Sequence, residues 1–553
     1  MDGSDLGRDD GLLITGARVY TADPARPWAE ALATRGSHIS YVGTEAGARA
    51  HAGRGVEEVR VPGGLVVPGL NDSHAHVTLG AYGLHILDLD GVGTLHELQA
   101  RLRAYAAAHP ERPWIEGYGL AYEPLTRGDQ APRLAIDEAV ADRPVYLLAF
   151  DWHTSWANTE ALRRASIDRG ADIPPPGEVV VDEANGLATG MLKEGLAQGR
   201  VARLIPKPAP DQREGMLREA MRHLNRLGVT SVQNMDGDPE RLEQYERLRE
   251  RGHLTVRAYH YMSVYDRPED EPPLDLVQRF AGLPRRYTSP WNRTRGIKLF
   301  IDGVVESKTA LMLEPYADGS GDGGVPDMDL ATYRAVVVAA DALGLDVATH
   351  AIGDRGVRTA LDAYEAAQQA NGGRRGRRHR IEHIELIHPA DLPRFAGLGV
   401  TASMQPLHAA PGGDPRFTPW TILAGRDREP YAFAWRSLLE SGARLAFGSD
   451  WPVVTPDVRP GLHAALARVS RGGEPAGGWQ PQQCATLAQA LDAYTRGAAY
   501  AEAQDEVKGV VRAGMLADVT VFRQDLFRLS PAEIRDADVA LTVVDGRIVH
   551  RAP

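Results

Sequence analysis

Cysteine is almost absent from this sequence, which has one such residue, Cys484, among 553. A single cysteine cannot form an internal disulfide, so nothing in the chain indicates an oxidising compartment. The N-terminal stretch MDGSDLGRDDGLLITG is acidic and lacks the basic start and apolar core of a signal peptide. We therefore expect a cytoplasmic protein.

Long apolar runs and basic clusters are also scarce. The sequence has no run of about 18 apolar residues, so we expect no transmembrane helix. The formal net charge is −12, and the one dense basic run is GGRRGRRHR at 372–380. We interpret this run as a helix–strand connection and not as a nucleic-acid site. The expected partner is a small-molecule substrate, without nucleic acid or membrane, and the sequence is compatible with a homodimer.

Lysine is also scarce in this sequence. Of the 62 lysines and arginines, five are lysine, namely Lys193, Lys207, Lys298, Lys308 and Lys508. Arginine is used almost wherever a surface cation will do. A lysine inside a strand-like segment, as Lys298 is in GIKLFIDG, therefore needs a chemical reason.

Both ends of the chain alternate apolar and polar residues between glycine and aspartate turns. Short strands are predicted in GLLITGARVYT and HISYVGT near the start, and in ADVTVFRQD and VALTVVDGRIVHRAP near the end. Two strand-rich ends around a long middle predict one small composite β-sandwich domain, built from residues 1–66 and 501–553.

The middle of the chain, residues 67–500, alternates apolar strand-like runs with helical segments such as REGMLREAMRHLNRLG and LATYRAVVVAADALG. This alternation is typical of a parallel sheet. Eight strands are predicted, at 64–76, 229–237, 255–263, 296–303, 345–354, 379–386, 400–408 and 444–453. Eight β/α repeats predict an α/β fold of the (β/α)8 TIM-barrel type, with catalytic groups at the carboxyl ends of the strands.

The first two predicted strands are separated by a gap that is far too long for a plain βα connection. The gap contains RPVYLLAFDWHTSWANTEAL and GLATGMLKEGLA. We interpret residues 85–225 as an inserted α/β segment that lies over the barrel mouth.

Polar side chains gather at the carboxyl ends of the predicted strands. His74 and His76 end the first strand in PGLNDSHAHV, and residues i and i+2 of a strand point the same way. Neutral imidazole and carboxylate suit zinc and similar divalent ions. Strands four, five, six and eight supply the remaining members of the set: Lys298, His350, His383 and Asp450.

Four imidazoles can hold two metal ions if an anionic group lies between them. A buried lysine loses its proton more easily than a lysine in water, whose pKa is about 10.4. It can then add carbon dioxide and become a carbamate that bridges two metals about 3.5–4 Å apart. Arginine cannot do this, because its pKa stays above about 12.

Each residue taken alone also has a simpler interpretation. If all of these interpretations held, it would be a coincidence that the residues fall at strand ends in the right order. The alternatives are a core position for His350 or His383, a helix cap for Asp450, and an ion pair of Lys298 with Asp302 or Glu306.

The whole pattern resembles the amidohydrolase superfamily, with H-x-H on strand one, lysine on four, histidines on five and six, and aspartate on eight. More narrowly, it resembles amidohydrolase family 3, the branch that includes N-substituted formamide deformylase. The narrower resemblance rests on stretches that span nearly the whole chain: VPGLNDSHAH, DWHTSWANTEAL, GIKLFIDG followed by SKTALMLEPY, THAIGDRGV, RIEHIEL, GSDWPV and ALDAYTRGAAYAEAQDEVKGVVRAGMLADVTVF.

The resemblance implies a metal-dependent hydrolase that cleaves a C–N (amide) bond of a small molecule by metal-activated hydroxide. An N-substituted formamide or another N-acyl amine is the expected substrate. Superfamily members differ in metal count, so one or two divalent ions are expected per chain, with zinc as the first choice. The implied ligands are His74, His76 and Asp450 for the buried metal, His350 and His383 for the outer one, and carbamylated Lys298 as the bridge.

Two residues are expected to act in catalysis. Asp450 would take a proton from the attacking water and later deliver it to the leaving amine. His153, in the inserted segment, would bind substrate and steady the oxyanion, or else cap the helix in TSWANTEAL. An apolar wall for the substrate is expected from Trp152, Trp156 and Trp451, with core packing as the alternative for each.

Two other functions stay open. One is a cyclic-amide hydrolase or a deaminase on the same scaffold, although one-metal deaminases of this superfamily usually lack the strand-four lysine. The other is a non-catalytic, metal-bearing binding or regulatory protein. Loss of Asp450 or of a histidine ligand would support that alternative, and none is lost.

Overall fold

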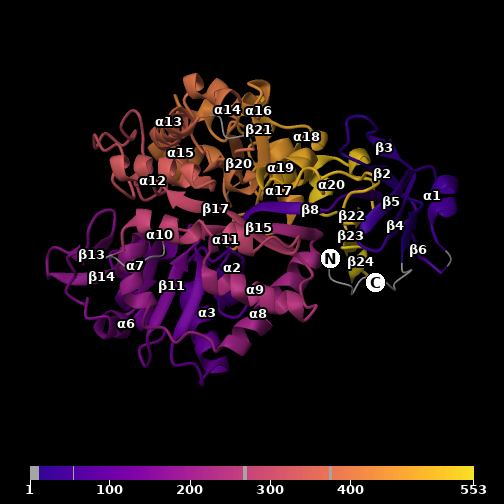
Figure 1. Ribbon diagram of the computed structural model, residues 1–553. Coiled ribbons are helices and arrows are strands. Elements are labelled where there is room, and N and C mark those ends of the chain that lie inside the picture. Colours follow the sequence, from indigo (N-terminus) through magenta and orange to yellow (C-terminus); the bar gives the residue numbers. More distant parts are fainter. Residues whose placement is uncertain (1–10, 54, 266–270, 373–375, 411) are drawn as a thin grey trace.

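The computed structural model describes residues 11–53, 55–265, 271–372, 376–410 and 412–553. A sheet of parallel strands forms its centre and follows the sequence in order (Figure 1). The sheet closes because the His76 N–H donates to the Trp451 carbonyl and the Asp450 N–H donates to the His74 carbonyl, both at 2.7 Å. This confirms the predicted α/β barrel. Its strands are β8 (Leu70–Ala75), β15 (Val229–Gly237), β16 (Arg257–Ser263), β17 (Asn292–Phe300), β18 (Asp346–Ala351), β19 (Arg380–His383), β20 (Thr401–Met404) and β21 (Arg444–Phe447).

The strand predicted at 64–76 is two strands in the structure. β7 (Leu65–Pro68) pairs outside the barrel with β2 (Arg18–Tyr20) and β22 (Val519–Phe522), whereas β8 pairs with β15 inside it. Gly69 separates them, and a Cβ at this position would lie 2.4 Å from Thr230 Oγ1. The prediction of one strand was wrong because a continuous apolar run does not show where the chain passes from one sheet to another.

Several other predicted strands end earlier than expected, most of all the last two. β20 ends at Met404 and leads into a short 3-10 helix, Pro406–Ala409, while β21 ends at Phe447. Asp450 therefore lies in a loop, where its φ is +63°. A positive φ is costly for a residue with a side chain and persists only where the surroundings enforce it. The hydrogen bond from Asp450 to β8 supplies part of that enforcement.

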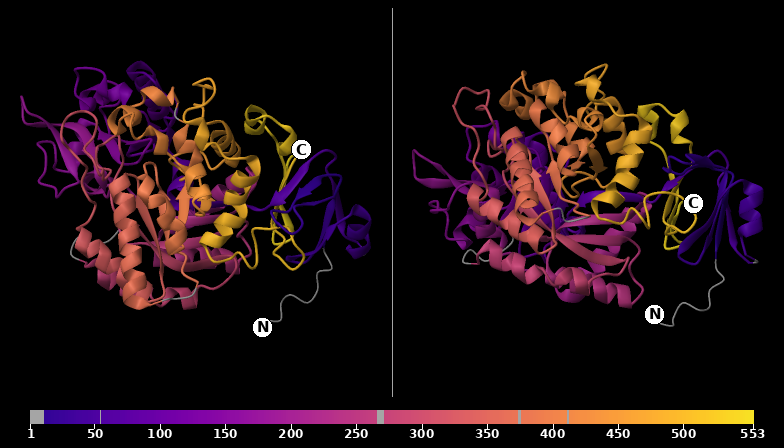
Figure 2. Two further views of the ribbon diagram at one scale, coloured as in Figure 1. Left: turned by 90° about the horizontal axis from the view of Figure 1, so that it is seen from above. Right: turned by 45° about the horizontal axis from the view of Figure 1, so that its top comes forward.

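Strands from both ends of the chain form two further sheets beside the barrel, indigo and yellow in Figure 1. β7 pairs antiparallel with β22, so the two ends share a sheet, as predicted. Figure 2 shows the C-terminus on this side of the molecule. The limits 1–66 and 501–553 stay a prediction. One sheet contains β1 (Leu12–Thr15), β4 (Ala31–Arg35), β5 (His38–Gly43) and β6 (Glu57–Arg60), and the other β2 (Arg18–Tyr20), β3 (Trp28–Ala29), β7, β22 (Val519–Phe522), β23 (Val539–Val544) and β24 (Arg547–Arg551).

The segment between β8 and β15 contains its own mixed sheet. Helix α3 (Leu95–Ala108) lies between the first two strands of this sheet in the sequence. The predicted insertion extended to residue 225, but α8 (Pro210–Arg226) packs against α2 (Val77–Gly83) and β15, as a barrel helix does. The strands of the inserted sheet are β9 (Leu87–Asp88), β10 (Ile115–Leu120), β11 (Val145–Ala149), β12 (Thr154–Ala157), β13 (Glu178–Asp182) and β14 (Leu187–Lys193).

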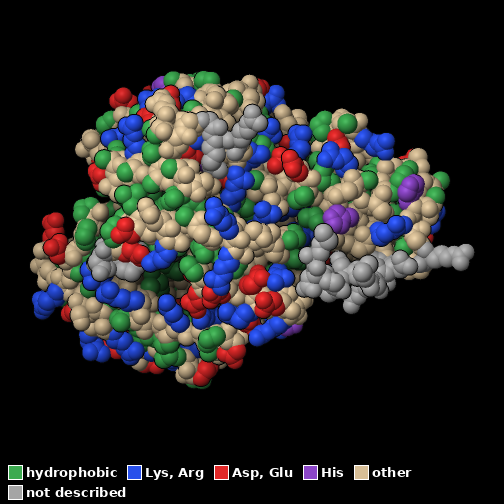
Figure 3. Space-filling model, viewed as in Figure 1, with side chains coloured by type: hydrophobic (Ala, Val, Ile, Leu, Met, Phe, Trp, Pro, Cys, Tyr) green, Lys and Arg blue, Asp and Glu red, His purple; other side chains and the backbone are tan. Residues whose placement is uncertain are grey.

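The surface carries charges of both signs. On the face in Figure 3, basic and acidic side chains are interspersed. The basic run at 372–380 follows α13 (Asp354–Asn371) and leads into β19, although residues 373–375 lie outside the described chain. Within that run Arg377 pairs with Asp341 at 2.6 Å. None of the helices in the described residues combines the length and the apolar character that a membrane span requires.

Candidate active site

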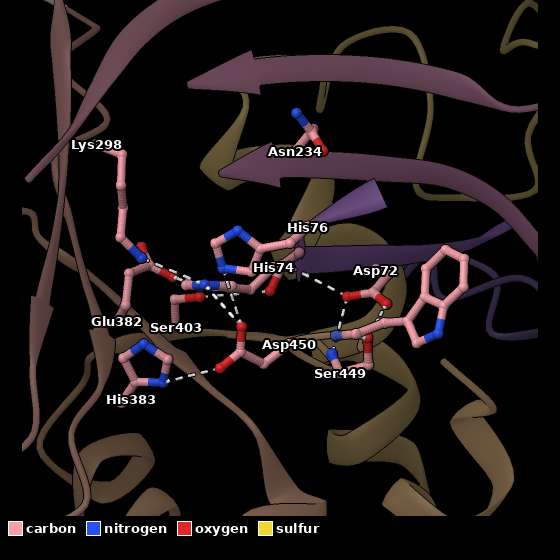
Figure 4. Close-up of polar contacts among 12 residues, drawn as sticks. Asp72, His74, His76, Asn234, Lys298, Glu382, His383, Ser403, Ser449 and Asp450 are labelled. Carbon is pink, nitrogen blue, oxygen red and sulfur yellow. Dashed lines mark hydrogen bonds and ion pairs between the residues drawn. The ribbon is translucent and has the colours of Figure 1, made fainter. Parts of the chain in front are cut away.

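Asp450 lies at the centre of a cluster of imidazoles at the carboxyl ends of the barrel strands (Figure 4). Its Oδ1 is 3.3 Å from Nε2 of His74 and 3.3 Å from Nε2 of His76. Its Oδ2 is 3.8 Å from Nδ1 of His383 and 4.0 Å from Nε2 of His408. The next helix, α17 (Val458–Ala467), is capped by Asp457, so Asp450 does not act as its cap.

His74 is oriented by a buried carboxylate. Its Nδ1 donates to Glu382 Oε2 at 2.7 Å, which leaves the Nε2 lone pair facing Asp450. Burial lowers the pKa of His74 to about 3, and the Lys298 charge acts in the same direction. Arg380 bonds both oxygens of Glu382 and keeps that carboxylate charged. Carboxylate–histidine pairs of this kind hold the ligands of many metal sites.

Lys298 lies in β17 with 1% of its surface exposed. Its Nζ is 3.3 Å from His74 Nε2, and among the described residues it forms no ion pair with Asp302 or Glu306, the partners in the alternative interpretation. Asp302 instead accepts backbone N–H groups of Leu311, Ile352 and Gly353. Burial lowers the pKa of Lys298 to about 8, against the opposing charges of Glu382 and Asp450. A neutral amine is the form that can add carbon dioxide.

Asp72 anchors the loop that carries Asp450. It accepts from the Ser449 hydroxyl at 2.5 Å, from the Ser449 N–H at 2.9 Å and from the His74 N–H at 3.2 Å. Burial raises the pKa of Asp72 to about 6, and these hydrogen bonds oppose the rise. Sequence reasoning missed this residue, although it stands two positions before the first histidine of the H-x-H pattern.

His383 and His350 lie beside each other, with ring centroids 4.5 Å apart. Their Nδ1 atoms are buried without a hydrogen-bond partner among the described residues, so neither is a fully satisfied core histidine. His350 stacks on Phe300 at 4.9 Å, and its Nδ1 is 3.4 Å from Asp302 Oδ1. Burial lowers the pKa of both imidazoles well below the usual range. Both are therefore neutral and able to bind a metal.

Sequence reasoning also missed His408, which follows β20. Its Nδ1 is 3.6 Å from Glu385 Oε1, and its ring lies parallel to that of His383 at 6.1 Å. Glu385 in turn accepts from the Trp420 indole N–H at 2.7 Å. The position of His408 in MQPLH, at the end of the seventh predicted strand, was a signal that could have found it.

The donor set fits a divalent metal. Within the described chain, two groups of three side chains have ligand atoms within 4.8 Å of one another, and they share Asp450. The groups combine buried imidazole nitrogens with a carboxylate, the ligand types of zinc-like ions. Several of these nitrogens lack a hydrogen-bond partner among the residues described, and they would be satisfied by an ion. The two groups are His74, His76 and Asp450, and His383, His408 and Asp450.

The inserted segment brings His153 to the same site. Its ring centroid is 5.6 Å from that of His350, and its Nδ1 is 2.8 Å from Glu194 Oε2. Burial opposes the charged imidazolium, but Glu194 outweighs it and raises the pKa of His153 to about 9. The helix in TSWANTEAL is capped by Asn158, so His153 is free of that role. A protonated imidazole at this place can donate to a developing oxyanion.

The three predicted tryptophans lie in different surroundings. Trp156 is fully buried in the core of the inserted sheet, beside Tyr122 at 5.4 Å. Trp451 packs under α2, where a Cβ on Gly80 would lie 2.5 Å from its ring. Trp152 is partly exposed next to His153 and has a φ of +65°. Packing thus accounts for Trp156 and Trp451, while Trp152 remains the candidate for the predicted apolar wall of the substrate site.

A parallel barrel with imidazoles and a carboxylate gathered at its strand ends defines the class of metal-dependent barrel hydrolases. Within that class the chain belongs to the amidohydrolase family, whose sequence model matches residues 61–550. The chain is therefore a hydrolytic enzyme of the metal-dependent amidohydrolase type, acting on carbon–nitrogen bonds.

Individual relatives match over nearly their whole length. The protein LONG AFTER FAR-RED 3 of Arabidopsis thaliana is 30% identical, over 98% of this chain and 91% of that protein. The N-substituted formamide deformylase of Arthrobacter pascens is 27% identical, over 97% of each chain. A crystal structure of an uncharacterized metal-dependent hydrolase from Pyrococcus horikoshii has a TM-score of 0.75 and 25% identity, and covers 95% of this chain and 99% of that chain.

Proposed function

We propose that the protein hydrolyses the amide bond of an N-substituted formamide or another small N-acyl amine. One observation carries the proposal: the Asp450 carboxylate lies between two sets of imidazoles, at 3.3 Å from His74 and His76 on one side and at 3.8 Å from His383 on the other. The similarity to an N-substituted formamide deformylase, at 27% identity, supports this choice of substrate class.

The residues present would hold divalent metal, with zinc as the first choice. When bound, such an ion lowers the pKa of a water and polarises a carbonyl. Glu382 fixes the His74 tautomer so that Nε2 would be available to a metal ion. The neutral form of Lys298 would add carbon dioxide and become the anionic bridge if two ions bind. We assign His74, His76 and Asp450 to one ion and His350 and His383 to the other.

Asp450 is suited to move protons because its two oxygens face both sets of imidazoles. We assign it the removal of a proton from the attacking water and its delivery to the leaving amine. His153, which Glu194 keeps protonated, would donate a hydrogen bond to the carbonyl oxygen as negative charge develops there. Trp152, adjacent to His153, would cover the substituent of the substrate.

The other hydrolytic functions predict different products. A cyclic-amide hydrolase would open a ring, and a deaminase would release ammonia, whereas an N-acyl amine hydrolase releases a carboxylic acid and an amine. A panel of formamides, N-acyl amines, cyclic amides and amino-heterocycles, followed by product identification, separates the three.

The first experiment compares Asp450→Asn with the wild type on the most active substrate of that panel. We expect kcat to fall by about 10²–10⁴-fold, the usual contribution of a positioned acid–base group. The matched control is Asp427→Asn, a change at an exposed aspartate, which should retain full activity. Unchanged turnover in folded Asp450→Asn would contradict the assigned role, and inactivity of the metal-loaded wild type on every amide would contradict the substrate class.

A further inference from the structure

Two carboxylate–imidazole pairs point at opposite oxygens of Asp450. In the first pair, His74 Nδ1 is 2.7 Å from Glu382 and its Nε2 is 3.3 Å from Asp450 Oδ1. In the second pair, His408 Nδ1 is 3.6 Å from Glu385 and its Nε2 is 4.0 Å from Asp450 Oδ2. In both imidazoles, Nδ1 faces a glutamate and Nε2 faces the shared aspartate.

The second pair has the features of a metal ligand and its support. Glu385 is 7% exposed and is held by the Trp420 indole N–H at 2.7 Å, so it can fix the His408 ring. The His408 Nε2 atom is buried and has no hydrogen-bond partner in the described chain. The His383 ring lies parallel to it, and His383 Nδ1 is likewise buried and unpartnered. Ligating histidines commonly have a carboxylate beside their other ring nitrogen, and the 3.6 Å contact of His408 Nδ1 with Glu385 places one there.

His350 has different surroundings. Its Nδ1 faces Asp302 Oδ1 at 3.4 Å and its ring stacks on Phe300, so one edge of the imidazole is directed to the barrel wall. It belongs to neither of the two groups whose ligand atoms lie within 4.8 Å of one another among the described residues. His408, which the sequence pattern did not indicate, instead forms such a group with His383 and Asp450.

We propose that His408, oriented by Glu385, is a further ligand of the outer metal, in addition to the imidazoles assigned above. The inference rests on the proposed metal-dependent function and adds a ligand to it. The two oxygens of Asp450 face both sets of imidazoles, and the loop after β20 would contribute a ligand to the centre. Two carboxylates close to His408, Glu385 and Asp450, would favour a divalent cation at this place through their charge.

The test measures metal binding directly. Wild type, His408→Ala, His408→Gln and Glu385→Gln are stripped with chelator, reloaded with zinc and bicarbonate, and titrated calorimetrically, with bound zinc counted by elemental analysis. The control is His96→Ala, a change at an exposed histidine of α3. Circular dichroism and thermal melting establish that each variant is folded, and His408→Gln serves if the alanine variant is not.

We expect the wild type and His96→Ala to bind two equivalents. The second equivalent should weaken by at least about 100-fold in the His408 variants and by about 10–100-fold in Glu385→Gln, the range for residues that support a ligand. If a folded His408 variant binds zinc with unchanged stoichiometry and affinity, the assignment is overturned, whatever its KM, while the proposed function stands. A wild type that hydrolyses amides with one tightly bound ion would overturn it too. A wild type that binds no zinc and hydrolyses no amide would overturn both.

Discussion

At the scale of single residues, the chemistry of Lys298 depends on its surroundings. Few lysines occur in the chain, and this one is nearly fully buried, next to His74 and with its Nζ 4.8 Å from the centroid of the Phe300 ring. Burial disfavours the charged ammonium. The side chain can therefore serve as a source of a carbamate, which an arginine at the same place could not become.

Changing Lys298 to Met should test this role, because methionine has a similar length but cannot form a carbamate. We expect bound zinc to fall from two equivalents to one or none, and hydrolysis to fall with it. Elemental analysis and initial rates, each measured after loading in bicarbonate, provide the readout. Lys207→Met, a change at an exposed lysine, is the control. Two tightly bound ions in Lys298→Met would rule out the carbamate bridge.

At the scale of elements, the position of Asp450 depends on a close crossing of two segments. The loop after β21 passes over β8, and a Cβ on Gly448 would lie 2.4 Å from the backbone nitrogen of His74. Asp72 ties the same loop to β8 through Ser449. A glycine is needed here because the nearest atom belongs to the backbone of β8 and cannot move aside separately.

Gly448→Ala should therefore separate β8 from the loop and displace Asp450. We expect a loss of stability of about 1–3 kcal/mol, as for other overpacked sites, together with a fall in kcat. Gly199→Ala is the matched control, because Gly199 lies in α7 (Glu194–Ala202) with nothing within 4 Å of its Cβ position. In a helix that change is expected to be neutral or to stabilise by about 1 kcal/mol. Equal urea denaturation midpoints for the two variants would contradict the crossing argument.

At the scale of the whole molecule, the composite sheets and the active site lie at opposite ends of the barrel. Arg257, at the start of β16, pairs with Asp518 at 2.7 Å and with Asp545 at 2.9 Å. Both aspartates belong to the C-terminal strands and their turns, and the Arg257 and Asp518 side chains are nearly fully buried. The sheets thus support the amino ends of the strands, while loops and the inserted segment shape the carboxyl ends.

Asp518→Asn should weaken this support by about 3–5 kcal/mol, the cost of leaving a buried charge unpaired. Asp536→Asn, at an exposed aspartate, should change little. Burial would raise the pKa of Asp518, but Arg257 outweighs burial and lowers it. The stabilisation is then present above the unfolded pKa of about 3.9 and is lost as the pH falls through the lower folded value. Urea denaturation at pH 7 and during acid titration measures both effects, and equal stability of the two variants would contradict the argument.

Much of the site could be predicted because each polar residue follows a local apolar run. Strand periodicity placed His74 and His76 on one side, and the order of β/α repeats put Lys298, His350, His383 and Asp450 at one end of a barrel. These residues do lie together in the structure. Local patterns suffice for them because the carboxyl ends of parallel barrel strands meet at one place.

The sequence by itself determined the barrel, the sheets from both ends of the chain and the identity of most polar groups at the mouth, because these follow from periodicity and side-chain chemistry. Only the tertiary structure decided the passage from β7 to β8 and the neighbours of Asp450. Glu382 lies 308 positions from His74, and Glu194 lies 41 positions from His153. Such contacts depend on how separate segments pack against one another, which no pattern within a single segment contains.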